Sequence, residues 1–323
     1  MARIVATSHL PGDPARLLDG HEWIGPARGD DAWSRVRWLG ELATADALVC
    51  LLSDRVDAEA LAAGPSLRVV ANYAVGHDNI DVAAATARGV AVANTPDVLV
   101  EASADFTFAL LLAAARRLGE GERLVRAGAW AGWTPDLLLG ADVGGQTLGI
   151  IGMGRIGRAV ARRAHGFAMT VLYTRGAPPD GVAATAVTLD ELLAQSDVVS
   201  VHCPLTAATH RLIDARALAA MKPGAILVNT ARGAIVDDAA LAEALERGHL
   251  GGAGLDVFVN EPAVDARLLA APRLVLAPHL GSATTTARTR MAELCVNAVR
   301  DVLSGRRPAN LINGDALAAR GRA

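Results

Sequence analysis

Several features that would place this chain in a particular class of protein are missing from its sequence. The 31 basic residues are outnumbered by 34 acidic ones, and no lysine- and arginine-rich block marks a nucleic-acid-binding surface. No apolar run reaches membrane-spanning length without polar interruption, and the N-terminus lacks the apolar stretch of a signal peptide. We therefore expect a cytoplasmic protein that binds neither nucleic acid nor a membrane.

Cysteine and aromatic residues are also scarce. Cys50, Cys203 and Cys295 form no CxxC or Cys/His pattern, so we expect free thiols, a reducing compartment and no metal site. Aromatic residues make up 3% of the chain, whereas hydrophobic residues, mainly Ala, Val and Leu, make up 52%. This composition favours buried strands that alternate with small-faced helices. The length of 323 residues predicts two domains with a cleft between them.

Short β-rich runs recur in two series, and helical spacing or turn residues follow each run. The first series comprises residues 3–7, 47–52, 68–72 and 90–94, and the second comprises 146–151, 170–173, 197–201, 225–229, 253–257 and 274–276. Strands that alternate with helices predict parallel sheets. The expected fold class is therefore α/β, with two doubly wound domains of the Rossmann or flavodoxin type.

Two helices are expected to carry the chain between the domains. The first should span about residues 102 to 118 and be broken by Gly119 and Gly121, and the second should span about 285 to 303. The first domain is then discontinuous in sequence. The intervening segment 128–145 belongs to neither series, and its Trp130 and Trp133 indicate either a subunit interface or packing against the same chain.

A glycine motif opens the second series. Gly152, Gly154 and Gly157 follow a predicted strand directly and begin a predicted helix, which is the context of a dinucleotide-binding turn. At the end of the next strand, where NAD-binding proteins place a carboxylate, the chain has Thr174 and Arg175. An arginine there suits the 2′-phosphate of NADP(H), so we expect NADP(H) to be preferred and NAD(H) to remain possible. The alternative is a solvated arginine with little cofactor discrimination.

Three ionisable residues follow three successive strands of the second series: Arg232, Glu261 and His279. Ligands of parallel sheets bind at the carboxyl ends of the strands, where these residues should meet. Reduction of a 2-oxo acid needs a cation for the carboxylate, a proton donor, and a group that orients the donor and favours its charged form. Arg232, His279 and Glu261 supply these in turn. His202 also follows a strand and is the one serious competitor of His279.

The first domain offers a turn in the segment 72–81. The N–H groups of Val75 and Gly76 could bind a carboxylate as a small backbone nest, although an ordinary loop would have the same sequence.

These motifs resemble those of the D-isomer-specific 2-hydroxyacid dehydrogenases, and within that family the glyoxylate/hydroxypyruvate reductases. The resemblance covers nearly the whole chain and includes NYAVGHDNIDV (72–82), NTPDVLVEASADFTFALLL (94–112), GIIGMGRIGRAVARR (149–163), NTARGAIVDDAAL (229–241), GLDVFVNEP (254–262) and PHLGSAT (278–284). It implies that residues 1–97 and 287–323 form a substrate (catalytic) domain, that 98–286 form the dinucleotide-binding domain, and that the protein is a homodimer.

The resemblance also assigns residues to the two binding sites. Leu52 and Ser53 resemble positions that face the substrate. The predicted cofactor pocket contains the three glycines of the motif together with Thr174 and Arg175. It also contains Arg155, Ile156, Pro204, Thr209, Thr230, Ala231, Asp256, His279 and Gly281.

The implied reaction is hydride transfer to C2 of a small 2-oxo acid, with His279 as proton donor, which gives glycolate from glyoxylate or D-glycerate from hydroxypyruvate. Two alternatives remain open at this point. Phosphite dehydrogenase or another D-2-hydroxyacid dehydrogenase would carry the same three residues, and a dinucleotide-sensing binding protein could use the same scaffold without turnover.

Overall fold

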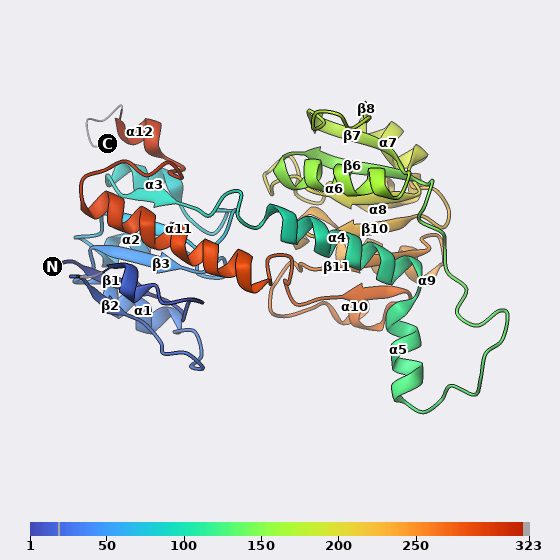
Figure 1. Cartoon of the computed structure of the whole chain (residues 1–323), viewed down its shortest axis with the longest axis horizontal. Helices are drawn as coiled ribbons and strands as arrows, with labels where there is room; N and C mark the ends of the chain where they lie inside the picture. The colour runs from blue at the N-terminus through green and yellow to red at the C-terminus, as the bar shows by residue number, and fades with distance from the viewer. Residues whose placement is uncertain (19, 319–323) are drawn as a thin grey trace. The chain divides into compact units, whose positions relative to one another are not determined.

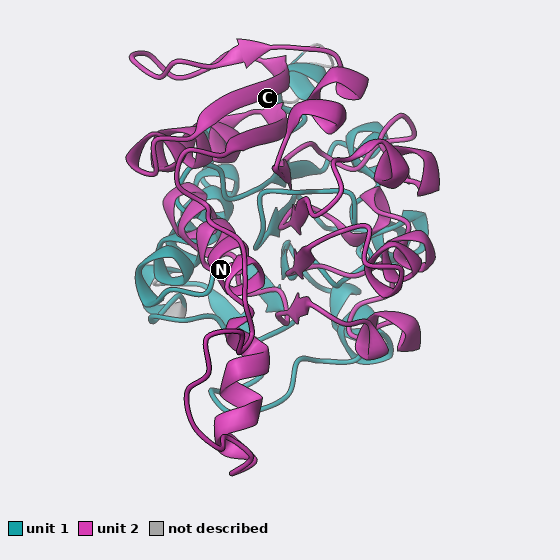
Figure 2. Ribbon diagram, turned by 90° about the vertical axis from the view of Figure 1, so that its right-hand side faces the viewer, with its two compact units in different colours: residues 1–99, 283–323 teal, residues 100–282 magenta. Residues whose placement is uncertain are grey.

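The computed structural model describes residues 1–18 and 20–318. The chain divides into two compact units (Figure 2). Unit 1 comprises Met1–Leu99 and Ala283–Ala323, and unit 2 comprises Val100–Ser282. Unit 1 is therefore built from both ends of the chain.

Unit 1 contains a parallel sheet of five strands in the order β2-β1-β3-β4-β5. The strands are β1 (Arg3–Ala6), β2 (Glu22–Ile24), β3 (Ala47–Cys50), β4 (Val69–Asn72) and β5 (Ala91–Ala93). This is the flavodoxin-like strand order, which reverses direction between β1 and β3. The helices are α1 (Arg35–Leu42), α2 (Ala58–Ala63), α3 (Val82–Ala87), α11 (Thr285–Leu303) and α12 (Gly314–Ala318), with a 3-10 turn, η1, at Ala15–Leu18.

Unit 2 contains a parallel sheet of seven strands in the order β12-β11-β10-β9-β6-β7-β8 (Figure 1). The strands are β6 (Thr147–Met153), β7 (Thr170–Gly176), β8 (Thr185–Ala186), β9 (Val198–Val201), β10 (Ile226–Asn229), β11 (Gly252–Leu255) and β12 (Leu274–Leu276). The helices are α4 (Val100–Ala115), α5 (Leu118–Arg126), α6 (Arg155–Gly166), α7 (Leu189–Gln195), α8 (Ala215–Ala220), α9 (Asp238–Glu246) and α10 (Ala266–Ala270), with a 3-10 turn, η2, at Gly233–Ile235. The order is that of a Rossmann domain, with its switch point between β6 and β9. The predicted α/β fold class is confirmed.

The strand sequences are continuous apolar runs because both faces of each sheet are covered. Every residue of β3, β4, β9, β10 and β11 is buried. In unit 2, one cluster of buried side chains includes Leu192, Ile213 and Leu241, and another includes Phe108, Leu148 and Val160. Burial on both faces removes the alternation of apolar and polar residues, so strand positions depend on the turns between them.

The helix ends follow local capping chemistry. The Thr188 side chain accepts a hydrogen bond from the Glu191 N–H while the Glu191 carboxylate accepts one from the Thr188 N–H, which confirms the capping box that the sequence contains. Asp237 caps α9, and Gly248, with a φ of +68°, follows the end of that helix. These residues set the two ends of α9, the helix between β10 and β11.

The predicted helix from 102 to 118 is wrong at its end. α4 stops at Ala115, and Gly119 and Gly121 lie inside a second helix, α5. The Ala115 carbonyl accepts a hydrogen bond from the Ala141 N–H at 2.9 Å, so the returning chain occupies the acceptor that the next helical turn would use. This tertiary contact ends α4, and no local sequence signal predicts it. The short strands β2 and β8 were also not predicted.

The segment after α5 stands off from the sheet of its own unit (Figure 1). Trp130 is 54% exposed and Trp133 is 79% exposed. Packing of these rings against the same chain, one of the two alternatives from the sequence, is therefore not what the structure shows. No helix within the described ranges is both long and apolar enough to cross a membrane.

Candidate functional site

The glycine motif sits where β6 ends and α6 begins. β6 continues to Met153, beyond the end of the predicted strand, so Gly152 lies among its last residues. Gly152 has a φ of +100°, and a Cβ there would lie 2.9 Å from the Cys203 nitrogen. A Cβ on Gly157 would overlap the Gly152 carbonyl oxygen. Both positions therefore require glycine because of backbone packing at the switch point.

Gly154 differs from the other two glycines. A Cβ at this position would have no protein atom within 4 Å, and Gly154 is the N-cap of α6. The first hydrogen bond within α6 joins the Arg158 N–H to the Gly154 carbonyl, so the helix begins with N–H groups that have no intrahelical acceptor. Open space beside a positive helix end fits the pyrophosphate of a dinucleotide.

Thr174 and Arg175 lie on the strand next to the glycine motif. Thr174 is the register partner of Ile151, and Gly176 is the partner of Met153. Arg175 is exposed and has a φ of +53°, an uncommon conformation for a residue other than glycine. An exposed arginine at this strand end can reach an anionic group near the ribose.

Loops after β9 and β10 supply further predicted cofactor contacts. After β9, the Thr209 hydroxyl donates to the Pro204 carbonyl at 2.7 Å and accepts from the Thr206 N–H at 2.8 Å, which closes the loop on itself. After β10, the Ala231 N–H donates to the Asn229 side chain, and the Thr230 hydroxyl lies 3.1 Å from that of Thr107. The loop after β9 is thus fixed by internal hydrogen bonds, and the loop after β10 is fixed by a local bond and by a contact with α4.

Arg232 follows β10 and is the N-cap of η2. Its backbone carbonyl accepts a hydrogen bond from the Asn229 side chain at 2.9 Å. A Cβ on the next residue, Gly233, would overlap the backbone of Phe258, so the loop after β10 packs directly on the loop after β11. The Arg232 charge is one of the groups that lower the pKa of Glu261, which places the two side chains in electrostatic contact.

Glu261 and His279 form a hydrogen-bonded pair. The Glu261 Oε2 atom lies 2.8 Å from His279 Nδ1, and its Oε1 atom accepts from the Phe258 N–H at 2.9 Å. Burial raises the pKa of Glu261, but the hydrogen bonds from His279 and Phe258 outweigh it, so its pKa is lowered overall. The carboxylate is therefore ionised beside the imidazole ring, whose Nε2 atom faces away from it.

Asp256 holds the loop that carries His279. Asp256 is 1% exposed, and its carboxylate accepts hydrogen bonds from the N–H groups of Leu280 at 2.6 Å and Gly281 at 2.8 Å. The His279 N–H donates to the Asp256 carbonyl, and His279 has a φ of +54°. Burial raises the pKa of Asp256. The sequence placed Asp256 and Gly281 in the cofactor pocket, and the structure shows in addition that they fix the backbone of His279.

His202 is in a different environment from His279. Its Nε2 atom lies 2.8 Å from the Ser200 hydroxyl, and desolvation lowers its pKa to about 4. A histidine that stays neutral near pH 7 is poorly suited to donate a proton.

In unit 1, the turn after β4 exposes two N–H groups. The Gly76 carbonyl accepts from the Asn72 side chain at 2.7 Å, and the Val75 carbonyl accepts from the Asn94 side chain at 2.8 Å. Within the part of the chain that the structure describes, the N–H groups of Val75 and Gly76 donate no hydrogen bond. Leu52 and Ser53 lie in the loop after the neighbouring strand β3, and Ser53 is exposed.

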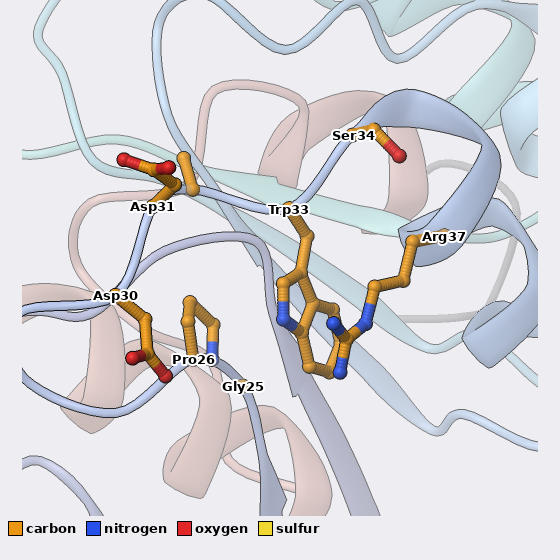
Figure 3. Close-up of a pocket in the computed structure, with 8 residues that line it drawn as sticks. Gly25, Pro26, Asp30, Asp31, Trp33, Ser34 and Arg37 are labelled. Carbon is orange, nitrogen blue, oxygen red and sulfur yellow. The ribbon is translucent and has the colours of Figure 1, made fainter.

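Two surface hollows contain none of the predicted site residues. One, in unit 1, is lined by Trp33, Asp30, Asp31 and Arg37, whose guanidinium covers the Trp33 ring at 4.3 Å (Figure 3). The other, in unit 2, is lined by charged residues that include Asp238 and Arg267. Among residues 1–18 and 20–318, no cluster of three or more His, Cys, Asp or Glu side chains could hold a metal ion.

Sequence reasoning missed the amides that shape the unit 1 turn. Asn72, Asn79 and Asn94 lie in or beside the motif that was predicted to bind a carboxylate, but nothing in their spacing showed which carbonyls they would bind.

The fold and the glycine motif define a dinucleotide-binding oxidoreductase of the Rossmann class. The NAD-binding domain of the D-isomer-specific 2-hydroxyacid dehydrogenases matches residues 108–281, more than half of the chain. The chain belongs to this family and is an NAD(P)-dependent oxidoreductase, as the motifs predicted.

Relatives with known names are similar over nearly their full length. The glyoxylate reductase of Thermococcus gammatolerans is 49% identical, with 98% of this chain and 97% of the relative covered. A crystal structure of a Thermus thermophilus protein is 48% identical, with a TM-score of 0.89 and coverage of 96% and 99%. The NADPH-dependent glyoxylate/hydroxypyruvate reductase of Sinorhizobium meliloti, in complex with NADP and malonate, is 35% identical, with a TM-score of 0.83 and 96% of each chain covered.

Proposed function

We propose that this chain reduces glyoxylate to glycolate and hydroxypyruvate to D-glycerate, with NADPH preferred over NADH. The observation that carries the proposal is the Glu261–His279 pair beside Arg232, at the carboxyl ends of three adjacent strands. This set of groups matches the needs of 2-oxo acid reduction. The glyoxylate reductase of Thermococcus gammatolerans, at 49% identity, supports the choice of substrate.

The chain's own residues would act in the following way. In unit 2, Arg232 binds a substrate carboxylate through its guanidinium. In unit 1, the N–H groups of Val75 and Gly76 form a candidate carboxylate-binding turn. Because Nδ1 of His279 faces Glu261, its Nε2 is left to donate a proton to the carbonyl oxygen. The ionised Glu261 stabilises the imidazolium before transfer and orients the ring. A bound nicotinamide dinucleotide would supply the hydride.

The preference for NADPH rests on Arg175. Its guanidinium carries the positive charge that a 2′-phosphate requires, and Thr174 adds a hydroxyl at the same strand end. The NADPH-dependent relative from Sinorhizobium meliloti supports this preference.

We also propose a homodimer in which the segment with Trp130 and Trp133 contacts a second copy of the chain. Large exposed aromatic side chains are typical of interfaces, and both rings are more than half exposed. The three cysteines are buried and free, which fits the cytoplasmic location that we propose.

The proposal is tested by following NADPH and NADH oxidation with glyoxylate, hydroxypyruvate, pyruvate and 2-oxoglutarate, and NAD(P)+ reduction with phosphite. We expect fast turnover of the first two acids with NADPH. Turnover of phosphite alone would assign the site to phosphite oxidation. Tight NADPH binding without any turnover would indicate a dinucleotide-sensing protein.

A further inference from the structure

One side-chain amide in unit 1, that of Asn79, joins the loops that follow the neighbouring strands β3 and β4. Its Nδ2 atom donates to the carbonyl oxygens of Leu51 at 3.1 Å and Asp54 at 2.9 Å. Its Oδ1 atom accepts from the Asn72 side chain at 3.1 Å. The backbone reinforces the link, because the Val56 N–H donates to the Asn79 carbonyl at 2.9 Å. Asn79 therefore fixes the separation of the two loops.

Asn72 connects this amide to the turn with the free N–H groups. The same Asn72 Nδ2 atom that reaches Asn79 also donates to the Gly76 carbonyl at 2.7 Å, and Asn72 is fully buried. With the Val75 carbonyl held by Asn94, both carbonyls of the turn are directed toward side-chain amides. The peptide groups that carry the two N–H donors are held by Asn94 at the Val75 carbonyl and by the Thr95 N–H at the Ala74 carbonyl. The two amides of Asn79 and Asn72 hold the Gly76 carbonyl, and they thereby link this turn to the loop after β3.

The other end of the network reaches the switch point of the unit 1 sheet. The Asp54 carboxylate accepts from the Leu51 N–H at 2.8 Å and from the Thr7 hydroxyl at 2.5 Å. Thr7 follows β1 directly, and the strand order reverses between β1 and β3. Ligands of open α/β sheets bind at the carboxyl ends of strands at such a point. Leu52 and Ser53, the predicted substrate-facing residues, lie between the two residues that this network anchors.

We propose that Asn79 is a positioning residue that sets substrate affinity and selectivity for small 2-oxo acids. It holds the carboxylate-binding N–H groups of Val75 and Gly76 at a fixed separation from the Leu52–Ser53 turn, which limits the size of the substrate. The inference rests on the proposed function, because it assigns the Val75–Gly76 turn to the substrate carboxylate.

A positioning role and a merely structural role for Asn79 predict different kinetics. Arg232, Glu261 and His279 all belong to unit 2, as does the glycine motif, so misplacement of the unit 1 loops should raise KM for the acid and leave kcat and the NADPH KM nearly unchanged. General destabilisation would lower the melting temperature without this split.

Asn313 provides a matched control in the same unit. It is a buried amide that accepts from the Val92 N–H and donates to the Thr86 hydroxyl and the Val90 carbonyl, each at 2.9 Å. These bonds hold β5 and the end of α3, and they do not involve the loops after β3 and β4. The variant Asn313→Ala should therefore lose stability and keep the native KM.

The experiment compares the full-length native enzyme with Asn79→Asp, Asn79→Ala and Asn313→Ala. Asn79→Asp keeps the shape of the side chain but replaces the N–H donors with an oxygen that faces two carbonyls. We expect both Asn79 variants to raise KM for glyoxylate and hydroxypyruvate about 10- to 100-fold and to change the ratio of kcat/KM for the two acids. Melting temperatures show how far each variant is destabilised. If Asn79→Asp does not fold, the comparison is made with Asn79→Ala.

Oxalate binding in the presence of NADPH provides a readout that needs no turnover. We expect the Asn79 variants to bind oxalate about 10-fold or more less tightly than the native enzyme. Native KM and oxalate affinity in a variant with a lowered melting temperature would overturn the inference and leave a structural role. A native enzyme that binds oxalate but reduces neither acid would refute the proposed function alone.

Discussion

Glu261 Oε2 and His279 Nδ1 lie 2.8 Å apart although the two residues are 18 positions apart in sequence. Adjacent strands β11 and β12 bring them together, and the buried carboxylate of Asp256 fixes the backbone after His279. Glu261 in turn is anchored by the Phe258 N–H. Both carboxylate oxygens and the imidazole Nδ1 thus have identified partners, which leaves Nε2 as the group available for proton transfer.

Substitutions at two glycines of the dinucleotide motif should affect protein stability and NADPH binding separately. Gly157→Ala introduces a Cβ that overlaps the Gly152 carbonyl, and the expected loss of about 1–3 kcal/mol exceeds the ~1 kcal/mol that alanine gains as a helix former. A Cβ at Gly154 would have no protein atom within 4 Å, and φ there is −80°, so Gly154→Ala should fold normally. Its methyl group would occupy the space proposed for the pyrophosphate and should weaken NADPH binding. Urea unfolding and NADPH titration of both variants test this. A stable Gly157→Ala, or a Gly154→Ala that binds NADPH as tightly as the native chain, would contradict the account.

Arg175 should control the choice of cofactor. Arg175→Asp removes the charge that we propose for the 2′-phosphate and supplies a carboxylate for the ribose hydroxyl, and aspartate tolerates the left-handed φ of +53°. We expect the ratio of kcat/KM for NADPH over NADH to fall about 10- to 100-fold. Arg216→Asp, at a side chain that is 76% exposed on α8, makes the same charge change elsewhere and should leave the ratio unaltered. An equal fall in both variants would indicate a general charge effect.

The proposed dimer contact is testable at Trp133. Trp133→Ser replaces a ring that is 79% exposed in the single chain, so the isolated unit should lose little stability. We expect the native protein to sediment as a dimer and the double variant Trp130→Ser/Trp133→Ser to shift toward monomer. Phe167→Ser, at a ring of 36% exposure stacked on Phe108, controls for loss of an aromatic side chain elsewhere on unit 2. A native protein that sediments as a monomer at micromolar concentration would refute the contact.

Asp238 should make stability depend on pH. Its pKa is raised to about 6, chiefly by desolvation and then by the charges of Asp265 and Asp237. The folded state therefore binds this proton more tightly than the unfolded state, so the native chain loses stability as the pH rises from about 4 through 6. Asp238→Asn should be more stable than the native chain by about 1 kcal/mol at pH 8, after allowance for solvent screening, and the gain should disappear near pH 4. Urea denaturation of both proteins at pH 4.5 and pH 8 measures this difference in stability. An Asp238→Asn variant that is less stable than the native chain at pH 8 would contradict the raised pKa of Asp238.

The sequence predicted those parts of the structure that depend on local chemistry. The strand-to-helix turn at the glycine motif is set by residues within a few positions of each other. The end of α4 could not be predicted because the Ala115 carbonyl bonds to Ala141, which lies beyond a long irregular segment.

The candidate site likewise has parts that the sequence could predict and parts that depend on tertiary contacts. The residue types of Arg232, Glu261 and His279, and their positions after strands, indicated the chemistry, because parallel strands bring their carboxyl ends to one edge. The sequence could not show that Asp256 binds two N–H groups of the His279 loop or that Asn79 joins two loops of unit 1. These contacts depend on side-chain directions that become defined only when the sheets are assembled.

The most direct test of the central claim is the pH dependence of glyoxylate reduction with saturating NADPH in the native enzyme and in His279→Gln. We expect the native kcat/KM to fall as the pH rises, because the reduction consumes the proton that His279 donates, and we expect the variant to lose about 10²- to 10⁴-fold in kcat together with this dependence. The variant His202→Gln should keep the native profile, since the low pKa of His202 already makes it neutral. A His279→Gln enzyme with near-native kcat and an unchanged pH profile would show that the proton comes from another group.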